Sequence, residues 1–288
     1  MPEKINQNPK MKIVLFNLVI FFIFCQLGTN QCSAARDKIG VVVSILPQVE
    51  FVEQVGGEKV KITLMIPPGA NPHTYEPTPA QLKRVSEAKV YFKVGSGIEF
   101  ELVWMDKITS CNEKILVVDC SREIKLIDND PHIWLSPKNA GKMVENICQG
   151  LIQVDPENKD YYLTRKQIYI QKLIELDREI SGRLTGKKKR KFIAYHPAWA
   201  YFAREYGLQQ IPVKKEGKQP TLKTIMRVIN QARSEKVRVI FVSPQFDRKK
   251  AETIAENIHG RIVFLDPLAK DYVDNLRSVA LELARSMS

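Results

Sequence analysis

Short apolar runs alternate with stretches of helical periodicity along most of the chain. Between the runs, as at 222–232, apolar residues recur with the i, i+3, i+4 spacing of an amphipathic helix. Runs of strand length occur at 41–46, 59–66, 90–94, 115–119, 192–196, 208–213, 237–242 and 261–266. Alternation of this kind predicts an α/β fold in which parallel sheets are flanked by helices on both faces.

A long helix is predicted between the two groups of strands. Asp155 suits the N-cap and Pro156 the first helical position, and the apolar pattern then continues to Leu184. Such a helix would be about 43 Å long at 1.5 Å per residue, which suits a rigid strut between two lobes. We therefore predict an N-terminal α/β lobe over 36–155, a linking helix over 156–186 and a C-terminal α/β lobe over 187–288.

The first 35 residues have the features of a targeting segment. Two lysines precede an apolar run over 13–27, and Ser33-Ala34-Ala35 offers small residues for cleavage. This pattern is typical of a secretory signal peptide over 1–35 that is cut after Ala35. A retained membrane anchor is the alternative, although the run is short for a span of about 20 residues.

Three cysteines, Cys111, Cys120 and Cys148, would remain in the secreted chain. Cys111 and Cys120 flank one predicted strand, so they would form a disulfide only if the chain turns back. The spacing lacks the paired Cys-X-X-Cys pattern of a structural zinc site. Cys25 or Cys32 is a candidate for lipid attachment, although neither follows the usual small-residue pattern.

The chain is basic, with 44 Lys and Arg against 32 Asp and Glu and a formal net charge of +12. Such a balance suits nucleic acid, an anionic membrane surface or acidic partners. Part of the excess is one run, Lys187-Lys188-Lys189-Arg190-Lys191, which we interpret as a solvated turn. Aromatic residues are not interleaved with the basic ones and no nucleic-acid motif occurs, so no nucleic-acid partner is predicted.

The histidines share an unusual position in the predicted fold. His73, His132 and His196 lie in loops at or just beyond strand ends, each beside a proline, and Asp266 also ends a strand and precedes a proline. Ligands bind α/β sheets outside the carboxyl ends of the strands. These four side chains are therefore candidates to meet in one cleft, two from each lobe. His259, at the opposite end of its strand, is predicted to be a surface residue.

Three imidazoles and one carboxylate match four-coordinate Zn²⁺. Mn²⁺ is also compatible if the carboxylate binds through both oxygens. Taken singly, each of these residues fits an ordinary polar loop position as well. A site filled by four protein ligands leaves no position for a water nucleophile, so it binds rather than catalyses. A zinc hydrolase with Asp266 as general base is the alternative, although no HExxH pair occurs; a surface adhesin with a structural metal is a third.

Four segments resemble the metal-binding regions of the zinc/manganese solute-binding proteins of ABC transporters. The resemblance covers about residues 40–286 and implies two α/β lobes joined by one rigid helix, with the metal in the cleft between them. It also implies that His73, His132, His196 and Asp266 are the ligands. The segments, in the family's order, are PPGANPHTYEP at 67–77, DPHIWLSPKNA at 130–140, AYHPAWAYFAREYGL at 194–208 and FLDPLAKDY at 264–272.

The resemblance implies a monomeric, non-enzymatic protein that binds a divalent transition metal and delivers it to a membrane permease with a cytoplasmic ATPase. Its location would be periplasmic or at the outer side of the cell membrane, with or without a lipid anchor. His196 stands where manganese members usually carry glutamate, which favours zinc. The His- and acid-rich loop of many zinc members is missing, since no other histidine lies between His73 and His132.

Residues close to the histidines in the sequence are expected to support them. Glu76 and Asp130 are candidates to hydrogen-bond the rings and orient them. Trp134 and Trp199 are expected to pack in the core rather than contact the ligand.

Overall fold

The computed structural model describes residues 37–287 except 129, 215–219 and 247. The segment from Lys38 onward forms one compact unit. The predicted signal peptide, with Cys25 and Cys32, lies outside the described residues. Within them, no helix is both long and apolar enough to cross a membrane.

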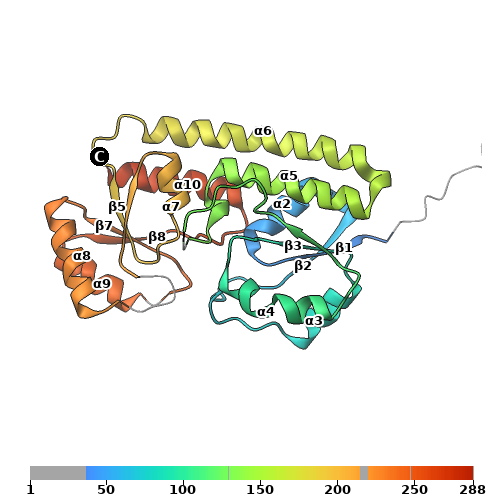
Figure 1. Ribbon diagram of the computed structural model, residues 1–288. Helices are drawn as coiled ribbons and strands as arrows, with labels where there is room; N and C mark the ends of the chain where they lie inside the picture. The colour runs from blue at the N-terminus through green and yellow to red at the C-terminus, as the bar shows by residue number, and fades with distance from the viewer. Residues whose placement is uncertain (1–36, 129, 215–219, 247, 288) are drawn as a thin grey trace, which may run out of the picture. The chain divides into compact units, whose positions relative to one another are not determined.

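The N-terminal half contains a parallel sheet with the strand order β2-β1-β3-β4 (Figure 1). Val41, Val42 and Val43 of the inner strand β1 are fully buried, as expected when helices cover both faces of a parallel sheet. The strands are β1 (Ile39–Val43), β2 (Val60–Leu64), β3 (Val90–Lys93) and β4 (Leu116–Asp119), and the helices between them are α2 (Leu46–Gly56), α3 (Pro79–Glu87) and α4 (Glu99–Ser110).

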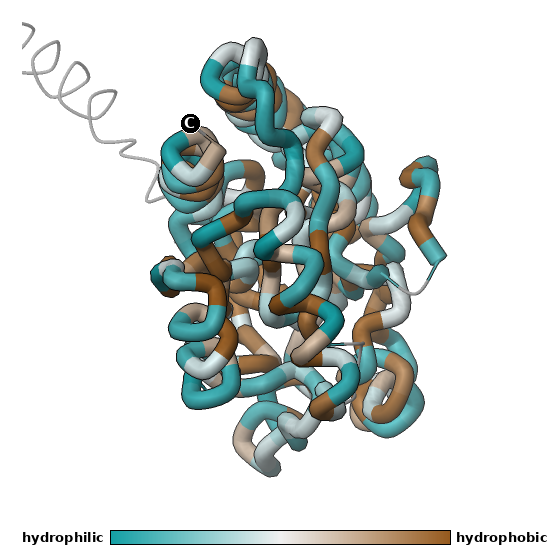
Figure 2. The backbone as a smooth tube through the Cα atoms, turned by 90° about the vertical axis from the view of Figure 1, so that its left-hand side faces the viewer, coloured by the Kyte–Doolittle hydropathy of each residue, from teal (hydrophilic) through white to brown (hydrophobic). Residues whose placement is uncertain are grey.

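The C-terminal half repeats this arrangement with the order β6-β5-β7-β8. Its strands are β5 (Lys191–Ala194), β6 (Gln209–Pro212), β7 (Val239–Val242) and β8 (Arg261–Phe264), and its helices are α7 (Ala200–Glu205), α8 (Leu222–Ser234), α9 (Lys249–Asn257) and α10 (Tyr272–Ser286). The predicted fold of two parallel sheets flanked by helices is thereby confirmed. In Figure 2, hydrophobic and hydrophilic positions alternate along the chain, as expected for helices that cover a sheet with one face.

Helix α5 (Pro137–Val154) was not predicted from the sequence. It begins with Ser136, whose hydroxyl accepts a hydrogen bond from the backbone N–H of Asn139 at 3.3 Å, and with Pro137 in its first turn. Its buried face, which has a clear helical period, consists of Ala140, Met143, Val144, Ile147, Cys148, Gly150 and Leu151. The signal for this helix is therefore present in the sequence.

The long helix α6 (Lys159–Leu184) starts later than predicted. A short 3-10 turn over Pro156–Asn158 leads into it, with Asp155 at the N-cap position and Pro156 in the first turn as predicted. The Asp155 side chain makes no capping hydrogen bond to the backbone, however, and the α-helix proper begins at Lys159. Asp155 follows α5, and its carboxylate accepts hydrogen bonds from Asn158 Nδ2 and the Tyr162 hydroxyl, each at 2.6 Å. The carboxylate thus fixes the corner between the two helices.

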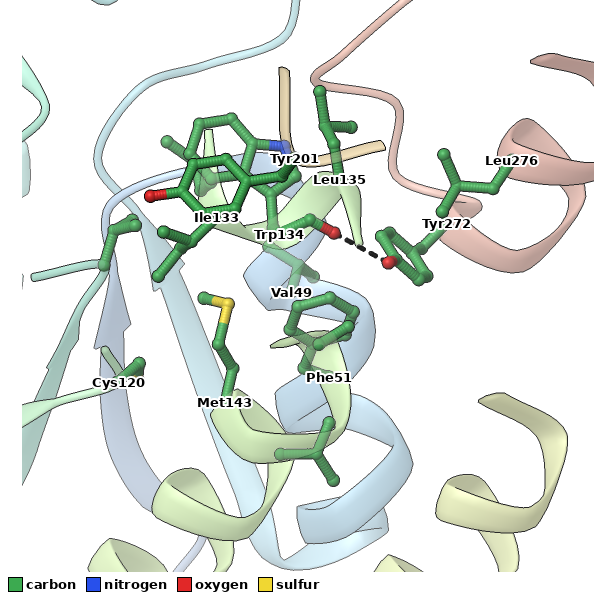
Figure 3. Packing of buried hydrophobic residues seen from close by; sticks show 14 of the residues in the cluster. Val49, Phe51, Cys120, Ile133, Trp134, Leu135, Met143, Tyr201, Tyr272 and Leu276 are labelled. Carbon is green, nitrogen blue, oxygen red and sulfur yellow. Dashed lines mark hydrogen bonds between the residues drawn. The ribbon is translucent and has the colours of Figure 1, made fainter. Parts of the chain in front are cut away.

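One continuous hydrophobic core joins the two halves. Helix α6 packs against α2 and α5 of the N-terminal half and against α10 of the C-terminal half. Tyr272 and Leu276 of α10 share a buried cluster with Phe51 and Met143 of the N-terminal half (Figure 3). The Tyr272 hydroxyl donates to the carbonyl of Trp134 at 2.7 Å. Helix α10 therefore buries part of its apolar face against the N-terminal half. The lobe boundaries at 155 and 186 stay a prediction.

The three cysteines of the described chain are free thiols. Cys111 follows α4 and Cys120 follows β4, so an extended strand separates them, and the disulfide considered between them does not form. Cys120 and Cys148 are fully buried, and burial raises the pKa of both thiols. A raised pKa keeps them protonated and unreactive.

Candidate metal site

The structure brings three of the four proposed ligands together. His73 follows β2, His132 follows β4 and His196 follows β5, and all three line one cavity of about 630 Å³. Nε2 of His196 lies 3.2 Å from Nε2 of His132. The ring centroid of His196 lies 5.1 Å from that of His132 and 5.8 Å from that of His73. The carboxyl ends of strands from both sheets thus gather these side chains.

Two of the rings are held by carboxylates at Nδ1. Nδ1 of His73 lies 2.9 Å from Glu99 Oε2, and Nδ1 of His132 lies 2.8 Å from Asp130 Oδ1. An ionised carboxylate only accepts hydrogen bonds, so in each pair Nδ1 donates, which in a neutral imidazole leaves the lone pair on Nε2. This arrangement is typical of metal-binding histidines, because it fixes both the tautomer and the ring orientation.

His196 is the most deeply buried of the three rings, with 4% of its surface exposed. Burial, and next the neighbouring His132, His73 and Lys214, lowers its pKa to about 2. Nδ1 of His196 is buried without a hydrogen-bond partner. The ring therefore stays neutral at physiological pH, which is the form that coordinates a metal.

The depressed pKa makes the stability of the metal-free protein depend on pH. The unfolded chain binds a proton at His196 below pH 6.5, whereas the folded chain does so only near pH 2. Unfolding thus takes up a proton at His196, and we expect this residue to lower the free energy of unfolding by at most about 1.4 kcal/mol per pH unit below pH 6.5. Urea denaturation at several pH values between about 5 and 7.5 measures this slope.

The His196→Phe variant supplies the comparison for this slope, because it keeps a ring of similar size that cannot titrate. Its free energy of unfolding should change less over the same pH range, while His259→Ala, at an exposed position, should behave like the parent. Equal slopes in the parent and His196→Phe would show that His196 does not titrate differently in the two states.

Asp266 lies next to the three histidines but not among them. It lines a smaller neighbouring cavity, which shares Ile45, Gln245 and Leu268 with the larger one. Asp266 Oδ1 accepts hydrogen bonds from Gln245 Nε2 at 2.7 Å and from the backbone N–H of Leu268 at 2.8 Å. In the arrangement seen for the described residues, no group of three or more His, Cys, Asp or Glu side chains is placed to hold a metal ion.

Several residues around the cavity were missed by the sequence analysis. Glu99, rather than the predicted Glu76, holds Nδ1 of His73, and Glu76 is exposed. Glu99 opens α4 just after β3, so the rule that located the histidines, a polar residue following a strand end, applies to it as well. The prediction that Asp130 supports His132 is confirmed by their 2.8 Å contact.

Gln245 and Phe246 follow β7 at the same edge of the sheet. The ring of Phe246 lies 4.5 Å from that of His196, and Lys214 Nζ lies 4.4 Å from the centroid of the same Phe246 ring. Gln245 Oε1 is buried without a hydrogen-bond partner, while its Nε2 binds Asp266. Gln245 thus stands between the histidine cavity and the carboxylate.

A buried carboxylate, Glu101, fixes the loop that precedes Glu99. It accepts hydrogen bonds from the backbone N–H groups of Val94 at 2.6 Å and Gly95 at 3.0 Å, and from the hydroxyl of Ser44. Burial raises the pKa of Glu101, and these hydrogen bonds oppose the rise. The carboxylate ties the ends of β1 and β3 together beneath the cavity.

Trp134 joins the loops that carry His132 and Asp266. Its Nε1 donates to the carbonyl of Pro267 at 2.7 Å, and its ring centroid lies 5.2 Å from that of His132. Trp134 and Trp199 are 2% and 1% exposed, which confirms that both pack in the core. His259 is exposed, as predicted.

Comparisons with known proteins give the same family as the sequence motifs. Residues 41–286 match the family described as zinc-uptake complex component A periplasmic. The chain is 31% identical over 255 residues to the high-affinity zinc uptake system protein ZnuA of Bacillus subtilis (strain 168), covering 81% of this chain and 79% of that protein. It is 27% identical over 283 residues to the manganese ABC transporter substrate-binding lipoprotein PsaA of Streptococcus pneumoniae, covering 90% of each.

Solved structures agree with this result. A zinc-bound deletion mutant of ZnuA superimposes with a TM-score of 0.83 at 37% sequence identity, over 88% of this chain and 99% of that one. The family match spans well over half of the sequence, so the resemblance stated from the four motifs is confirmed. The chain therefore belongs to the zinc-uptake component A family, the solute-binding proteins of zinc and manganese ABC transporters.

Proposed function

We propose that this protein captures zinc outside the cytoplasm, as a monomer exported by the signal peptide over 1–35. It then delivers the ion to the permease of an ABC transporter with a cytoplasmic ATPase. The observation that carries this proposal is the convergence of three imidazoles in one cavity, with Nδ1 of two of them held by carboxylates. The names of the zinc-uptake relatives support it.

The proposed ligands are His73, His132, His196 and Asp266. The two facing Nε2 atoms of His132 and His196 would both be satisfied by one ion. Asp266 would supply the fourth ligand by exchanging its hydrogen bond from Gln245 for the metal. Capture then consists of local side-chain exchange around a cavity whose histidines are already close together.

Zinc is proposed over manganese because of the donor set. Three neutral nitrogens and one oxygen suit Zn²⁺, whereas Mn²⁺ prefers more oxygen donors and a larger coordination number. The divalent series also places manganese below zinc in affinity for a given nitrogen and oxygen site. The manganese-named relative keeps manganese binding as the alternative.

A binding role suits the site better than hydrolysis. As a general base, Asp266 would need to take a proton from a metal-bound water, but with Asp266 as the fourth protein ligand no position is left for that water. We therefore assign no catalytic residue. Incubation of the zinc-loaded protein with ester, peptide and phosphoester substrates should give no turnover that a chelator abolishes.

Metal titration tests both the ion and the fourth ligand. We expect one zinc ion per chain, bound more tightly than manganese in competition with a chelating dye. Asp266→Asn should lower zinc affinity about tenfold or more, because it removes the charge of the only oxygen donor. The matched control is Asp106→Asn, which neutralises an exposed carboxylate on α4. Equal affinities for the two variants would remove Asp266 from the ligand set.

A further inference from the structure

Six cationic side chains surround a hollow at the other end of the C-terminal sheet, which we call the basic hollow. It measures about 660 Å³ and lies where the chain enters β5, β7 and β8, next to the end of α10. All six are exposed, and no acidic residue of the described chain lines the hollow. They are Lys189, Arg233, Lys236, Arg238, Arg261 and Arg285.

The positive charge of the basic hollow is only partly neutralised. Glu282 pairs with Arg285 at 2.7 Å and with Arg261 at 3.6 Å, so one carboxylate serves two guanidinium groups. Arg233 donates to the backbone carbonyl of Asn257, which carries no net charge. For Lys236 and Arg238 the described structure shows no side-chain hydrogen bond or ion pair. Like charges that line one hollow repel one another, and a multivalent anion would relieve that repulsion.

The backbone that presents these cations is fixed. Lys236 and His259 have positive φ values of 54° and 49°, each in the tight turn before a strand. The N–H of Arg261 donates to the carbonyl of Arg238 at 2.8 Å, and a Cβ on Gly260 would come within 2.3 Å of that carbonyl oxygen. The two turns therefore pack directly against each other, and the side chains extend from a defined scaffold.

We propose that the basic hollow binds a phosphate-bearing anion with several negative charges. Arginine guanidinium groups match phosphate oxygens with two parallel hydrogen bonds, and lysine adds a point charge. A concave surface of one charge sign concentrates the field that attracts such a ligand. The same chemistry is offered by a soluble polyphosphate and by the head groups of an anionic phospholipid surface. The site is independent of the metal, which would bind at the carboxyl ends of the strands.

The test is a calorimetric titration. The full-length, metal-free protein is titrated with inorganic tripolyphosphate at low ionic strength. The metal-free state is used because polyphosphate chelates zinc. The variant is the Lys236→Ala/Arg238→Ala double substitution, which removes two exposed side chains outside the core. The control, Lys172→Ala/Arg178→Ala, removes the same charge from exposed positions on α6. We expect the first variant to lose about tenfold in affinity per contact removed and the control to match the parent.

A parallel arm identifies the source of the phosphate. Vesicles of phosphatidylglycerol and of phosphatidylcholine are mixed with the same three proteins, and binding is measured by co-flotation. The proposal is supported if the Lys236/Arg238 variant selectively loses binding to tripolyphosphate, to phosphatidylglycerol or to both. The probe whose binding is lost identifies the source as a soluble polyphosphate, an anionic phospholipid surface or either one. Absence of binding to both probes, or equal binding by the two double variants, overturns it. His196→Ala should retain anion binding, which separates this site from the metal site.

Discussion

Replacing His196 by alanine is expected to lower zinc affinity by about 10²- to 10³-fold. Structural zinc sites bind with about 10–16 kcal/mol, so one of four ligands accounts for about 2.5–4 kcal/mol. His196 is the most deeply buried of the three rings, and its Nε2 lies 3.2 Å from that of His132. Competition with a chelator of known affinity measures the loss.

One control and one further ligand variant accompany this experiment. His259→Ala removes an exposed histidine at the opposite end of a strand and should leave zinc affinity unchanged. His73→Ala changes a less buried ring, with 17% of its side chain exposed, and should weaken zinc binding without a large loss of stability. Unchanged zinc affinity in both His196→Ala and His73→Ala would exclude the histidine cavity as the metal site.

Trp134→Ala is expected to destabilise the protein by about 3–5 kcal/mol, as truncation of a buried aromatic residue typically does. The indole is 2% exposed and packs in the shared core near Leu135 and Tyr201 (Figure 3). Its Nε1 also donates to the carbonyl of Pro267, so the substitution frees the loop that carries Asp266. Chemical denaturation of the metal-free protein measures the change.

Trp134→Phe separates packing from loop positioning. Phenylalanine keeps most of the apolar contact but cannot donate to Pro267, so the stability loss should be closer to about 1 kcal/mol. If the hydrogen bond positions Asp266, zinc affinity should fall in Trp134→Phe while the fold stays intact. The matched substitution Trp199→Phe, in the same core but away from the cavity, should not change zinc affinity. Equal zinc affinities in the two variants would contradict this role for Trp134.

Most of the fold could be predicted because strand length and helical period depend on residues that are neighbours in the sequence. The buried run at 41–43 and the helix after Thr221 needed no distant information. The start of α6 was misplaced because Asp155-Pro156 resembles a helix start, whereas Asp155 bonds to Tyr162 and closes a corner. The position of α10 against α6 depends on contacts between distant segments, which no local pattern contains.

The convergence of His73, His132 and His196 on one cavity could be predicted because strand ends in a parallel sheet share one edge. The partners were harder to predict, since a hydrogen bond such as His73–Glu99 joins residues 26 positions apart. Proximity in the sequence correctly identified Asp130 as the partner of His132, but it wrongly suggested Glu76 as the partner of His73. The hydrogen bond between Gln245 and Asp266 depends on how two adjacent strands of the C-terminal sheet end, which only the structure shows.

The core shared by α6, α10 and the N-terminal half resists separation of the two halves. A hinge opening between the two halves would expose Tyr272, Leu276 and Phe51 to water. That exposure costs about 1.5–3 kcal/mol for each side chain. We infer that the proposed zinc ion enters and leaves through movement of the loops that border the histidine cavity. In the delivery to a permease proposed above, the permease would then displace individual loops of this protein, while the shared core keeps its packing throughout the cycle.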